Sequence, residues 1–439
     1  MMPPTVTLPE ASMPEESRTI TTELAIIGTG IAGFAAAVFA LERKLTMAMA
    51  GSTGALAYTT GYLDLLGRLP GAAHAVDDPW LALEELRRSE PEHPLSLVAT
   101  ADIERAFTLF TDFLGREGLA YTPAGRSNLM AMTPAGTVKP TLSVPATMAA
   151  GPALMAAGSP CVIVDFHGLK GFSGRQAVAN LRQRWPELDT VRLAFPGSRG
   201  GELYPEIAAR SLQVPEVRQQ MAEMLRQAAG PASAVGLPAL LGMHRPDLVL
   251  QDLQRLSGLT LFEIPTMPPA VPGIRLRELF ARALPQRGVT IVPQQKVQRL
   301  HLDENGAHLT LGDNYGTISI HAEAVILATG RFLSGGLEAR RDTIREPLLD
   351  LPVVQPPGRS QWYEERYTDP RGHAIHRAGI VVDRTFRPLG GDGHPFHPRL
   401  FAAGIILAHQ DWIRSRSGAG IAITSACRAV DEAARLLGR

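Results

Sequence analysis

Cysteine is scarce in this chain of 439 residues: Cys161 and Cys427 lie far apart and form no CxxC pair. Two isolated thiols exclude a disulfide framework. They are also too few for a cysteine-ligated iron–sulfur cluster, which usually needs about four thiolates. We expect both to be small core residues, because reduced cysteine behaves as a buried hydrophobe.

A net charge and long apolar runs are missing as well. Lys plus Arg and Asp plus Glu each number 43, so no overall field attracts nucleic acid or anionic lipid. The longest apolar runs, such as 400–408, reach about half of a membrane span. We therefore expect a cytoplasmic protein that meets a membrane only through a partner or a surface patch.

Residues 1–22 lack the basic start and the apolar stretch of a signal peptide and are rich in Pro, Glu and Ser. We expect a disordered leader there. The chain as a whole is 45% hydrophobic and 20% charged, which is typical of a globular protein with a sizeable core. Its length suits two domains.

A strand–loop–helix–strand unit opens the ordered part. The apolar run 24–27 predicts a buried parallel strand, the Ala-rich segment 34–43 a helix, and 45–50 a second parallel strand. The glycine-rich loop Gly28-Thr29-Gly30-Ile31-Ala32-Gly33 joins the first strand to the helix. Its glycines permit a tight turn and let backbone N–H groups approach a phosphate at the helix N-terminus.

Later segments return to this domain. They predict a helix, a β-meander, an apolar strand, a closing strand and a final helix, as turn chemistry and alternation indicate. In chain order these are a helix over 274–284, meander segments 289–292, 296–302, 307–311 and 317–321, strands 324–328 and 399–403, and a helix from Gly418 or Ala419 to about 437.

The predicted fold is α/β. It combines a Rossmann-like FAD/NAD(P)-binding domain of the two-dinucleotide-binding type, carrying a β-meander, with an inserted second α/β domain. Strand and helix patterns at 160–166, 174–185, 232–238 and 247–256 indicate the insertion, and a hairpin is expected near 379–387. We assign 23–70, 271–330 and 399–439 to the cofactor-binding domain, and 71–270 and 331–398 to the second domain.

The order of these features indicates a bound flavin. The phosphate loop comes first, the strand ending in Thr329-Gly330 follows about 300 residues later, and the closing strand ends at Gly404. A glycine-led helix then places its positive end where charge develops at N1/O2 of a reduced flavin. The residues expected to contact the cofactor are Gly28, Gly30, Ile31, Ala32, Gly33, Gly51, Ser52, Thr59, Thr60, Gly61, Thr329, Gly330, Gly404, Gly418, Ala419 and Gly420.

One feature of an adenosine ribose site is absent. Such a site usually has Asp or Glu at the end of the second strand to bind the ribose hydroxyl, whereas this chain has Ala48-Met49-Ala50-Gly51 there. Ile405 also stands directly after Gly404, where flavin folds usually carry an acid, and Asp411 is the nearest substitute. We therefore favour FMN over FAD. A degraded site without flavin is the alternative.

Several longer strings are distinctive. They are TGYLDLL (60–66), HPLSL (93–97), TPAGT (133–137), LFEIPTMPPAVPGIRL (261–276) and ATGRFLSGGLEARRDTIREPLL (328–349), with QWY at 361–363. With these strings the chain, from about residue 23 to its end, resembles the B-subunit family of anaerobic glycerol-3-phosphate dehydrogenase, a flavoprotein family.

That resemblance implies an α/β flavoprotein, associated with FMN, that works with a FAD-containing catalytic partner, the A chain of the complex. It also implies an iron–sulfur partner, the C chain, that attaches the pair to the inner membrane. The implied complex oxidises sn-glycerol 3-phosphate to dihydroxyacetone phosphate and passes the electrons to quinone. The chain would then be a flavin-dependent oxidoreductase acting on a CH–OH donor.

Oxidising a secondary alcohol needs a base for the hydroxyl proton, and a phosphate substrate favours arginine or lysine. Catalytic candidates are Arg345 with Glu346, which form either a functional charge or a structural ion pair, and the two histidines His93 and His409. Candidates for the substrate phosphate are Arg275, Arg331 and Lys139.

No metal-ligand spacing such as HExxH occurs, so we expect no metal. Two other functions stay open. The chain could be a non-catalytic electron relay or scaffold beside the FAD-containing partner, or an independent flavoenzyme like fumarate reductase.

Overall fold

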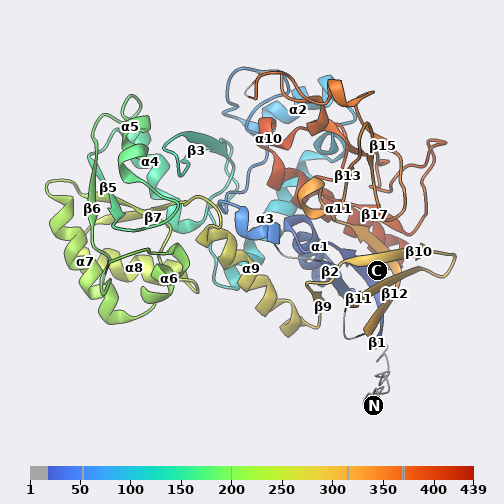
Figure 1. Ribbon diagram of the computed structural model, residues 1–439, viewed down its shortest axis with the longest axis horizontal. Coiled ribbons are helices and arrows are strands. Elements are labelled where there is room, and N and C mark those ends of the chain that lie inside the picture. Colours follow the sequence, from blue (N-terminus) through green and yellow to red (C-terminus); the bar gives the residue numbers. More distant parts are fainter. Residues whose placement is uncertain (1–17, 52–53, 199, 314–315, 368, 370) are drawn as a thin grey trace, which may run out of the picture.

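The computed structural model describes residues 18–51, 54–198, 200–313, 316–367, 369 and 371–439. Figure 1 shows two α/β units side by side, one built on a seven-stranded sheet and one on a four-stranded sheet. The predicted class, a Rossmann-like flavin-binding domain with a second α/β unit, is confirmed.

The larger sheet has the order β10-β11-β12-β1-β2-β9, with β17 paired to β12. Pairing is parallel from β17 and β12 through β1 and β2 to β9, and antiparallel among β10, β11 and β12. The strands are β1 (Arg18–Ile27), β2 (Met47–Gly51), β9 (Thr290–Pro293), β10 (Val297–Leu302), β11 (Ala307–Asp313), β12 (Gly316–Leu327) and β17 (Leu400–Ala402).

Three strand predictions need correction. β1 begins at Arg18, inside the predicted leader, because its first residues pair with the first half of β12. The segments predicted as 317–321 and 324–328 form one strand, since β12 runs unbroken alongside β1. β9 leaves the predicted meander and pairs in parallel with β2, so the meander consists of β10, β11 and β12.

Helices pack against this sheet and against one another. α1 is Ala-rich and almost wholly buried, and it packs against α11 and α3. Phe34 of α1 stacks on Phe280 of α9, with ring centroids 4.5 Å apart. The helices of this unit are α1 (Ile31–Glu42), α2 (Pro79–Ser89), α3 (Thr100–Arg116), α9 (Val271–Ala283), α10 (Trp412–Ser415) and α11 (Gly418–Leu436).

The smaller sheet is wholly parallel, in the order β6-β5-β7-β8, which is a doubly wound arrangement. Its core includes Trp185, Phe166 and Phe262. The elements are β5 (Cys161–Phe166), β6 (Leu188–Leu193), β7 (Ala234–Pro238), β8 (Thr260–Ile264), α4 (Ala150–Ala157), α5 (Gly174–Leu181), α6 (Pro205–Ser211), α7 (Pro215–Ala229), α8 (Pro246–Ser257) and the hairpin β3 (Leu129–Met132)–β4 (Val138–Thr141).

Short elements lie between the longer helices and strands. They include 3₁₀ turns η1 (Gly54–Tyr58), η2 (Pro94–Leu97), η3 (Ala146–Met148), η4 (Pro285–Arg287), η5 (Phe332–Ser334), η6 (Arg359–Gln361) and η7 (Ala374–Arg377), and two-residue strands β13 (Glu338–Ala339), β14 (Ile344–Arg345), β15 (Val353–Val354) and β16 (Gly379–Ile380). Near the hairpin expected at 379–387, β16 pairs with β15, and a single bridge joins Val382 to Pro388.

The two hydrophobic cores group the chain differently from the predicted domain boundaries, which stay a prediction. The larger core takes in buried residues from both 80–119 and 337–386, although the sequence favoured placing these stretches in the second domain. The reason is amphipathicity: α3 presents Ile103, Phe107 and Phe110 to α1 and α11. The smaller core draws on residues 132–264.

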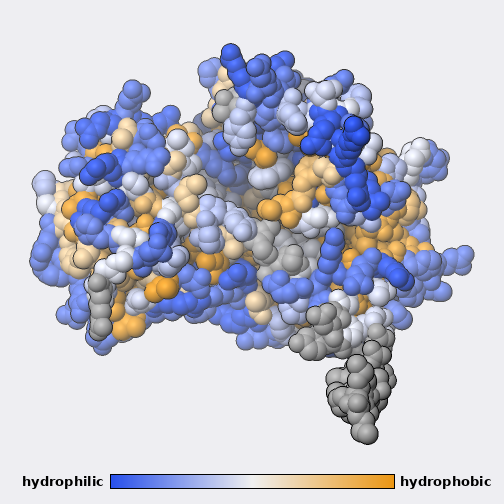
Figure 2. Space-filling model, viewed as in Figure 1, coloured by the Kyte–Doolittle hydropathy of each residue, from blue (hydrophilic) through white to orange (hydrophobic). Residues whose placement is uncertain are grey.

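Both cysteines are buried core residues, as predicted, and burial raises the pKa of each thiol to about 12. Within the ranges described, no helix is long and apolar enough to cross a membrane. The face of the molecule in Figure 2 is mostly hydrophilic, with hydrophobic residues scattered over both units.

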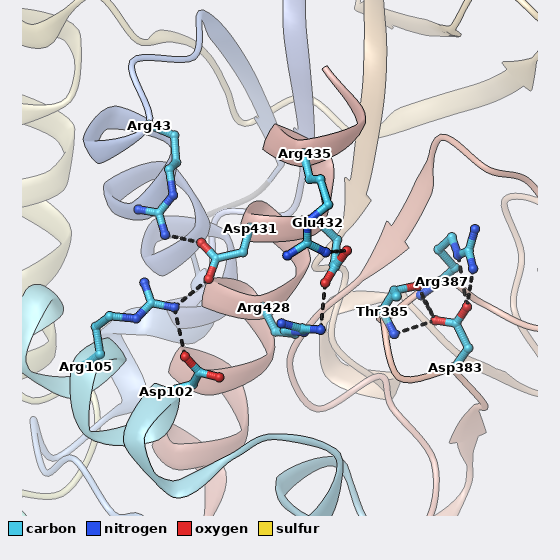
Figure 3. A network of polar contacts seen from close by, with 10 residues as sticks. All are labelled: Arg43, Asp102, Arg105, Asp383, Thr385, Arg387, Arg428, Asp431, Glu432 and Arg435. Atoms are coloured by element: carbon cyan, nitrogen blue, oxygen red, sulfur yellow. Dashed lines mark hydrogen bonds and ion pairs between the residues drawn. The ribbon is translucent and has the colours of Figure 1, made fainter. Parts of the chain in front are cut away.

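An ion-pair network ties the last helix to the first and third (Figure 3). Asp431 of α11 accepts from Arg43, which directly follows α1, and from Arg105 of α3, whose Nη2 lies 2.6 Å from Asp431 Oδ2. Asp431 is only 13% exposed, so its charge is poorly screened by water. The carboxylate therefore holds three helices together at one point.

We expect Asp431→Asn to lower the free energy of unfolding by about 1–2 kcal/mol, because two arginines lose a charged acceptor in a half-buried place. Urea denaturation measures this. Glu104→Gln is the matched control, since Glu104 lies 3.8 Å from Arg126 and both are exposed; its effect should stay within about 0.5 kcal/mol. Equal effects of the two changes would contradict the assignment.

Candidate functional site

The carboxyl ends of four parallel strands meet at one edge of the larger sheet. Ala50 of β2 accepts a 2.7 Å hydrogen bond from the N–H of Gly28, and the Ala328 and Ala403 N–H groups bond to β1 and β12. Ligands of open parallel sheets bind outside this edge. The predicted phosphate loop and the residues after β2, β12 and β17 are thus brought together.

Glycine is required in the loop for close packing. A Cβ on Gly28, whose φ is +121°, would lie 2.2 Å from the carbonyl oxygen of Ala328, and one on Gly33 would lie 1.9 Å from that of Gly28. A Cβ on Gly30 would meet no atom within 4 Å, so this residue faces open space. The loop is therefore packed on one side and accessible on the other.

This open side fits a phosphate group. No side chain caps the N-terminus of α1, so its first N–H groups are free to bind an anion. Among the described residues, the hydroxyls of Thr29 and Thr329 are buried without a hydrogen-bond partner, as expected of groups that await a ligand. Gly51 lies beside Thr29, and Gly404 beside Ala32.

The N-terminus of α11 meets the segment that follows η1. Its Gly420 N–H donates to the carbonyl of Asp64 at 2.6 Å, and a Cβ on Gly420 would lie 2.7 Å from the carbonyl oxygen of Leu65. Thr59 and Thr60 hold the turn, accepting from the N–H groups of Gly61 and Tyr62.

The structure thus places Asp64 and Leu65, which follow the predicted group at 59–61, against Gly420 at the N-terminus of α11. Ser52 lies outside the described residues. The predicted contacts of all these residues with the cofactor stay predictions.

Lys139 is paired within the chain. Its Nζ lies 2.5 Å from Oδ2 of Asp64, which is nearly buried, and 5.9 Å from the centre of the Tyr62 ring. Burial raises the pKa of Asp64 above its usual value, against the opposing effect of Lys139. Lys139 comes from β4 of the smaller unit, so this ion pair crosses between the units. Asp64 was not singled out from the sequence, where it is one residue of the string at 60–66, and only the fold shows its partner.

Arg275 is also bound within the chain, by more hydrogen bonds than Lys139. It forms two hydrogen bonds with Glu263 of β8, at 2.7 and 2.8 Å, and a third with the carbonyl of Gly242. Thr147 and the Leu241 N–H also donate to Glu263. Burial opposes ionisation of Glu263, but Arg275 and these donors hold its pKa below the ordinary value. Arg275 therefore joins α9 to the smaller unit, and its predicted contact with a substrate phosphate stays a prediction.

Arg331 is buried and binds backbone. It donates to the carbonyls of His376, Leu407 and Gln410. Burial lowers its pKa to about 10. The guanidinium therefore fixes the segment that follows β17. Its Nε is the part without a partner.

Arg345 and Glu346 do not pair with each other. Arg345 is exposed and lies 3.3 Å from Glu338, whereas Glu346 is buried and accepts from the N–H groups of Leu348 and Leu349. Burial raises the pKa of Glu346 despite these bonds. Arg345 of β14 pairs instead with Glu338, its cross-strand partner in β13. A functional role for Arg345 and Glu346 stays a prediction.

His93 and His409 lie close together, with Arg377 beside them. Burial lowers the pKa of His93 to about 3, and the charges of Arg377 and His409 add to this effect. The Leu95 N–H donates to Nδ1 of His93, so the neutral ring carries its proton on Nε2, which is buried without a partner. His93 is thus arranged as a hydrogen-bond donor. His409 is 20% exposed, with Nδ1 3.8 Å from Glu92.

The fold and this edge define a flavoprotein, and comparison agrees: the family described as FAD binding domain matches residues 23–421, so the chain belongs to it and binds a flavin. It belongs further to the B-subunit family of anaerobic glycerol-3-phosphate dehydrogenase. The B subunit from Vibrio vulnificus (strain CMCP6) is 32% identical over 94% of this chain and 96% of its own. The one from Vibrio cholerae (strain O395) is 33% identical over 93% and 96%.

A solved structure with a similar fold is the 3-ketosteroid-Δ4-(5α)-dehydrogenase from Rhodococcus jostii RHA1, in complex with 4-androstene-3,17-dione. It is 12% identical and matches 97% of this chain and 98% of its own, with a TM-score of 0.44. This likeness carries no argument about the site or the substrate.

Two glycine substitutions separate folding from cofactor binding. Gly33→Ala should lower the free energy of unfolding by about 2 kcal/mol or more and abolish flavin binding, because its Cβ would collide with backbone. Gly30→Ala should leave the thermal midpoint unchanged and lower flavin affinity, because its methyl group occupies the open side of the loop. Absorbance of bound flavin and thermal melting measure both. A stable, flavin-saturated Gly33→Ala variant would refute this packing.

His93 should make the fold acid-sensitive. Its pKa of about 3 in the folded chain lies below about 6.5 in the unfolded chain, so stability is lost as pH falls from 6.5 towards 3. At pH 5 the loss is about 2 kcal/mol. His93→Asn, which keeps an acceptor for Leu95 but cannot titrate, should unfold with a shallower pH dependence. The exposed His244→Asn serves as control; parallel wild-type and His93→Asn curves between pH 7 and 5 would disprove the prediction.

Proposed function

We propose that this chain is the flavin-carrying subunit of a membrane-associated anaerobic glycerol-3-phosphate dehydrogenase complex. In this proposal sn-glycerol 3-phosphate is oxidised to dihydroxyacetone phosphate, and the electrons pass to quinone. The partners are a FAD-containing catalytic chain and an iron–sulfur chain that holds the complex at the inner membrane. The observation that carries the proposal is the match to B subunits of this enzyme over nearly the whole of both chains.

The residues of this chain have three tasks in the proposal. The loop from Gly28 to Gly33 and the N-terminus of α1 hold the cofactor phosphate, as their open side and uncapped N–H groups support. The N-terminus of α11 faces the charge that develops on reduction. A bound flavin supplies the acceptor for the substrate's hydride.

FMN is the proposed cofactor, with FAD the alternative. β2 ends at Ala50 and Gly51, neither of which has a carboxylate for an adenosine ribose. FMN lacks the adenosine ribose, so an FMN site needs no carboxylate at the end of β2. The family match supports a flavin and leaves this choice to experiment.

His409 is the proposed base for the hydroxyl proton. It keeps partial contact with solvent, and Glu92 lies near its Nδ1. His93, in contrast, has its acceptor nitrogen occupied and the pKa of its ring depressed by burial, so it suits a hydrogen-bond donor. Arg345 and Glu346 stay weaker candidates, because one pairs with Glu338 and the other caps a turn.

One observation favours the electron-relay function as a second candidate. All three cations proposed for the substrate phosphate are engaged within the chain, Lys139 by Asp64, Arg275 by Glu263 and Arg331 by backbone carbonyls. A relay protein would need no phosphate ligand, since its FAD-containing partner would bind the substrate.

Two measurements on the purified protein test the proposal. Denaturation should release FMN, identified by chromatography; release of FAD would overturn the FMN assignment. Anaerobic sn-glycerol 3-phosphate should then bleach the flavin of the purified chain. Bleaching only when the partner chains are added would favour the relay function.

His409→Asn supplies the matched variant. It should slow bleaching by about 10²–10⁴-fold, the usual contribution of a general base, while the flavin content stays unchanged. His244→Asn, which changes an exposed histidine, is the control. An unchanged rate in His409→Asn would exclude His409 as the base.

A further inference from the structure

Three histidines stand in a row across the β-meander. The register places His301 of β10 opposite His308 of β11, and His308 opposite His321 of β12. Their neighbours Ala307, Leu309 and Ile320 are buried, so the alternation of side chains puts the histidines on the outer face. His301 and His321 are exposed, and His308 is 38% exposed. Figure 1 shows the meander at the end of the molecule away from the smaller unit.

His308 lies closer to His321 than to His301. The ring centroids of His308 and His321 are 4.8 Å apart with an interplanar angle of 75°, while those of His301 and His308 are 6.2 Å apart. Two imidazole nitrogens that share one metal ion are separated by about 3–3.5 Å, given bonds of about 2.0–2.1 Å. The nitrogens lie on the perimeters of the rings, so centroids 4.8 Å apart allow this separation.

A carboxylate fixes the orientation of His308. Oδ2 of Asp303 lies 3.0 Å from Nε2 of His308, while its Oδ1 accepts from the N–H groups of Asn305 and Gly306. The ionised carboxylate can only accept, so Nε2 carries the proton and Nδ1 keeps its lone pair. A carboxylate that orients a histidine in this way is the usual second partner of a metal ligand.

We propose that His308 and His321 bind a divalent transition-metal ion, with Asp303 positioning His308. Imidazole ligands favour Zn²⁺ and Cu²⁺ over Mg²⁺ or Ca²⁺. Within the described part of the chain no three His, Cys, Asp or Glu side chains surround one point, so the protein supplies two ligands and water completes the coordination. The site departs from the sequence expectation of no metal, and it is independent of the flavin and of the proposed reaction.

The test is a calorimetric titration with Zn²⁺ of the full-length, flavin-loaded protein, which carries no histidine tag. The wild type should bind one Zn²⁺. His308→Ala and His321→Ala should each weaken binding at least about tenfold, and Asp303→Asn about 10–100-fold. The asparagine keeps an oxygen for the turn, so the thermal midpoint without metal should not change. His244→Ala, remote and exposed, is the control and should bind as the wild type does.

Cu²⁺ supplies a second readout that does not depend on affinity. Its electron paramagnetic resonance spectrum should show coupling to two imidazole nitrogens in the wild type and in His301→Ala, and to one in His321→Ala. Equal binding by wild type and the His308→Ala/His321→Ala double variant would overturn the proposal. So would loss of the two-nitrogen signal in His301→Ala, because the metal would then lie on the other pair.

Discussion

Parallel pairing of β1 with both β12 and β2 is the constraint on which the rest of this structure depends. Because these strands run in one direction, the loops that follow them leave from one edge of the sheet. Segments that are far apart in the chain, at Gly28, Gly51, Thr329 and Gly404, therefore meet there. Tight backbone packing at this edge leaves the phosphate loop open on one side only.

Two ion pairs connect the two α/β units. Arg275 of α9 is bound to Glu263 of β8, and Asp64 to Lys139 of β4. Each pair joins an element of the larger unit to one of the smaller unit. The loss of one partner would leave a charge in a poorly hydrated place, so these pairs specify how the units dock more than they add stability. Arg275 and Lys139, two of the cations predicted to bind a substrate phosphate, thus take part in docking the units.

Polar groups near residues 405–410, the segment that follows β17, are likewise bound within the chain. Arg331 holds three backbone carbonyls, and His93 directs one nitrogen to a backbone N–H. His409, which stays partly exposed, is the group of this set that retains contact with solvent. Family membership and the sheet edge define a flavoprotein. The side chains that bind groups within the chain have fewer donors and acceptors left for a substrate.

Local chemistry by itself determined the α/β class, the glycine-rich loop and the helices α1, α5, α8, α9 and α11, because apolar runs, glycine spacing and alternation act over a few residues. It determined the burial of Cys161 and Cys427 for the same reason. Pairing across the chain was decided only by tertiary structure. β9 pairs with β2 and not with the meander, and Arg345 pairs with Glu338 and not with Glu346. Three histidines from residues 301–321 align in one row across the meander. Register and long-range ion pairs depend on which strands become neighbours, and no short stretch of sequence carries that information.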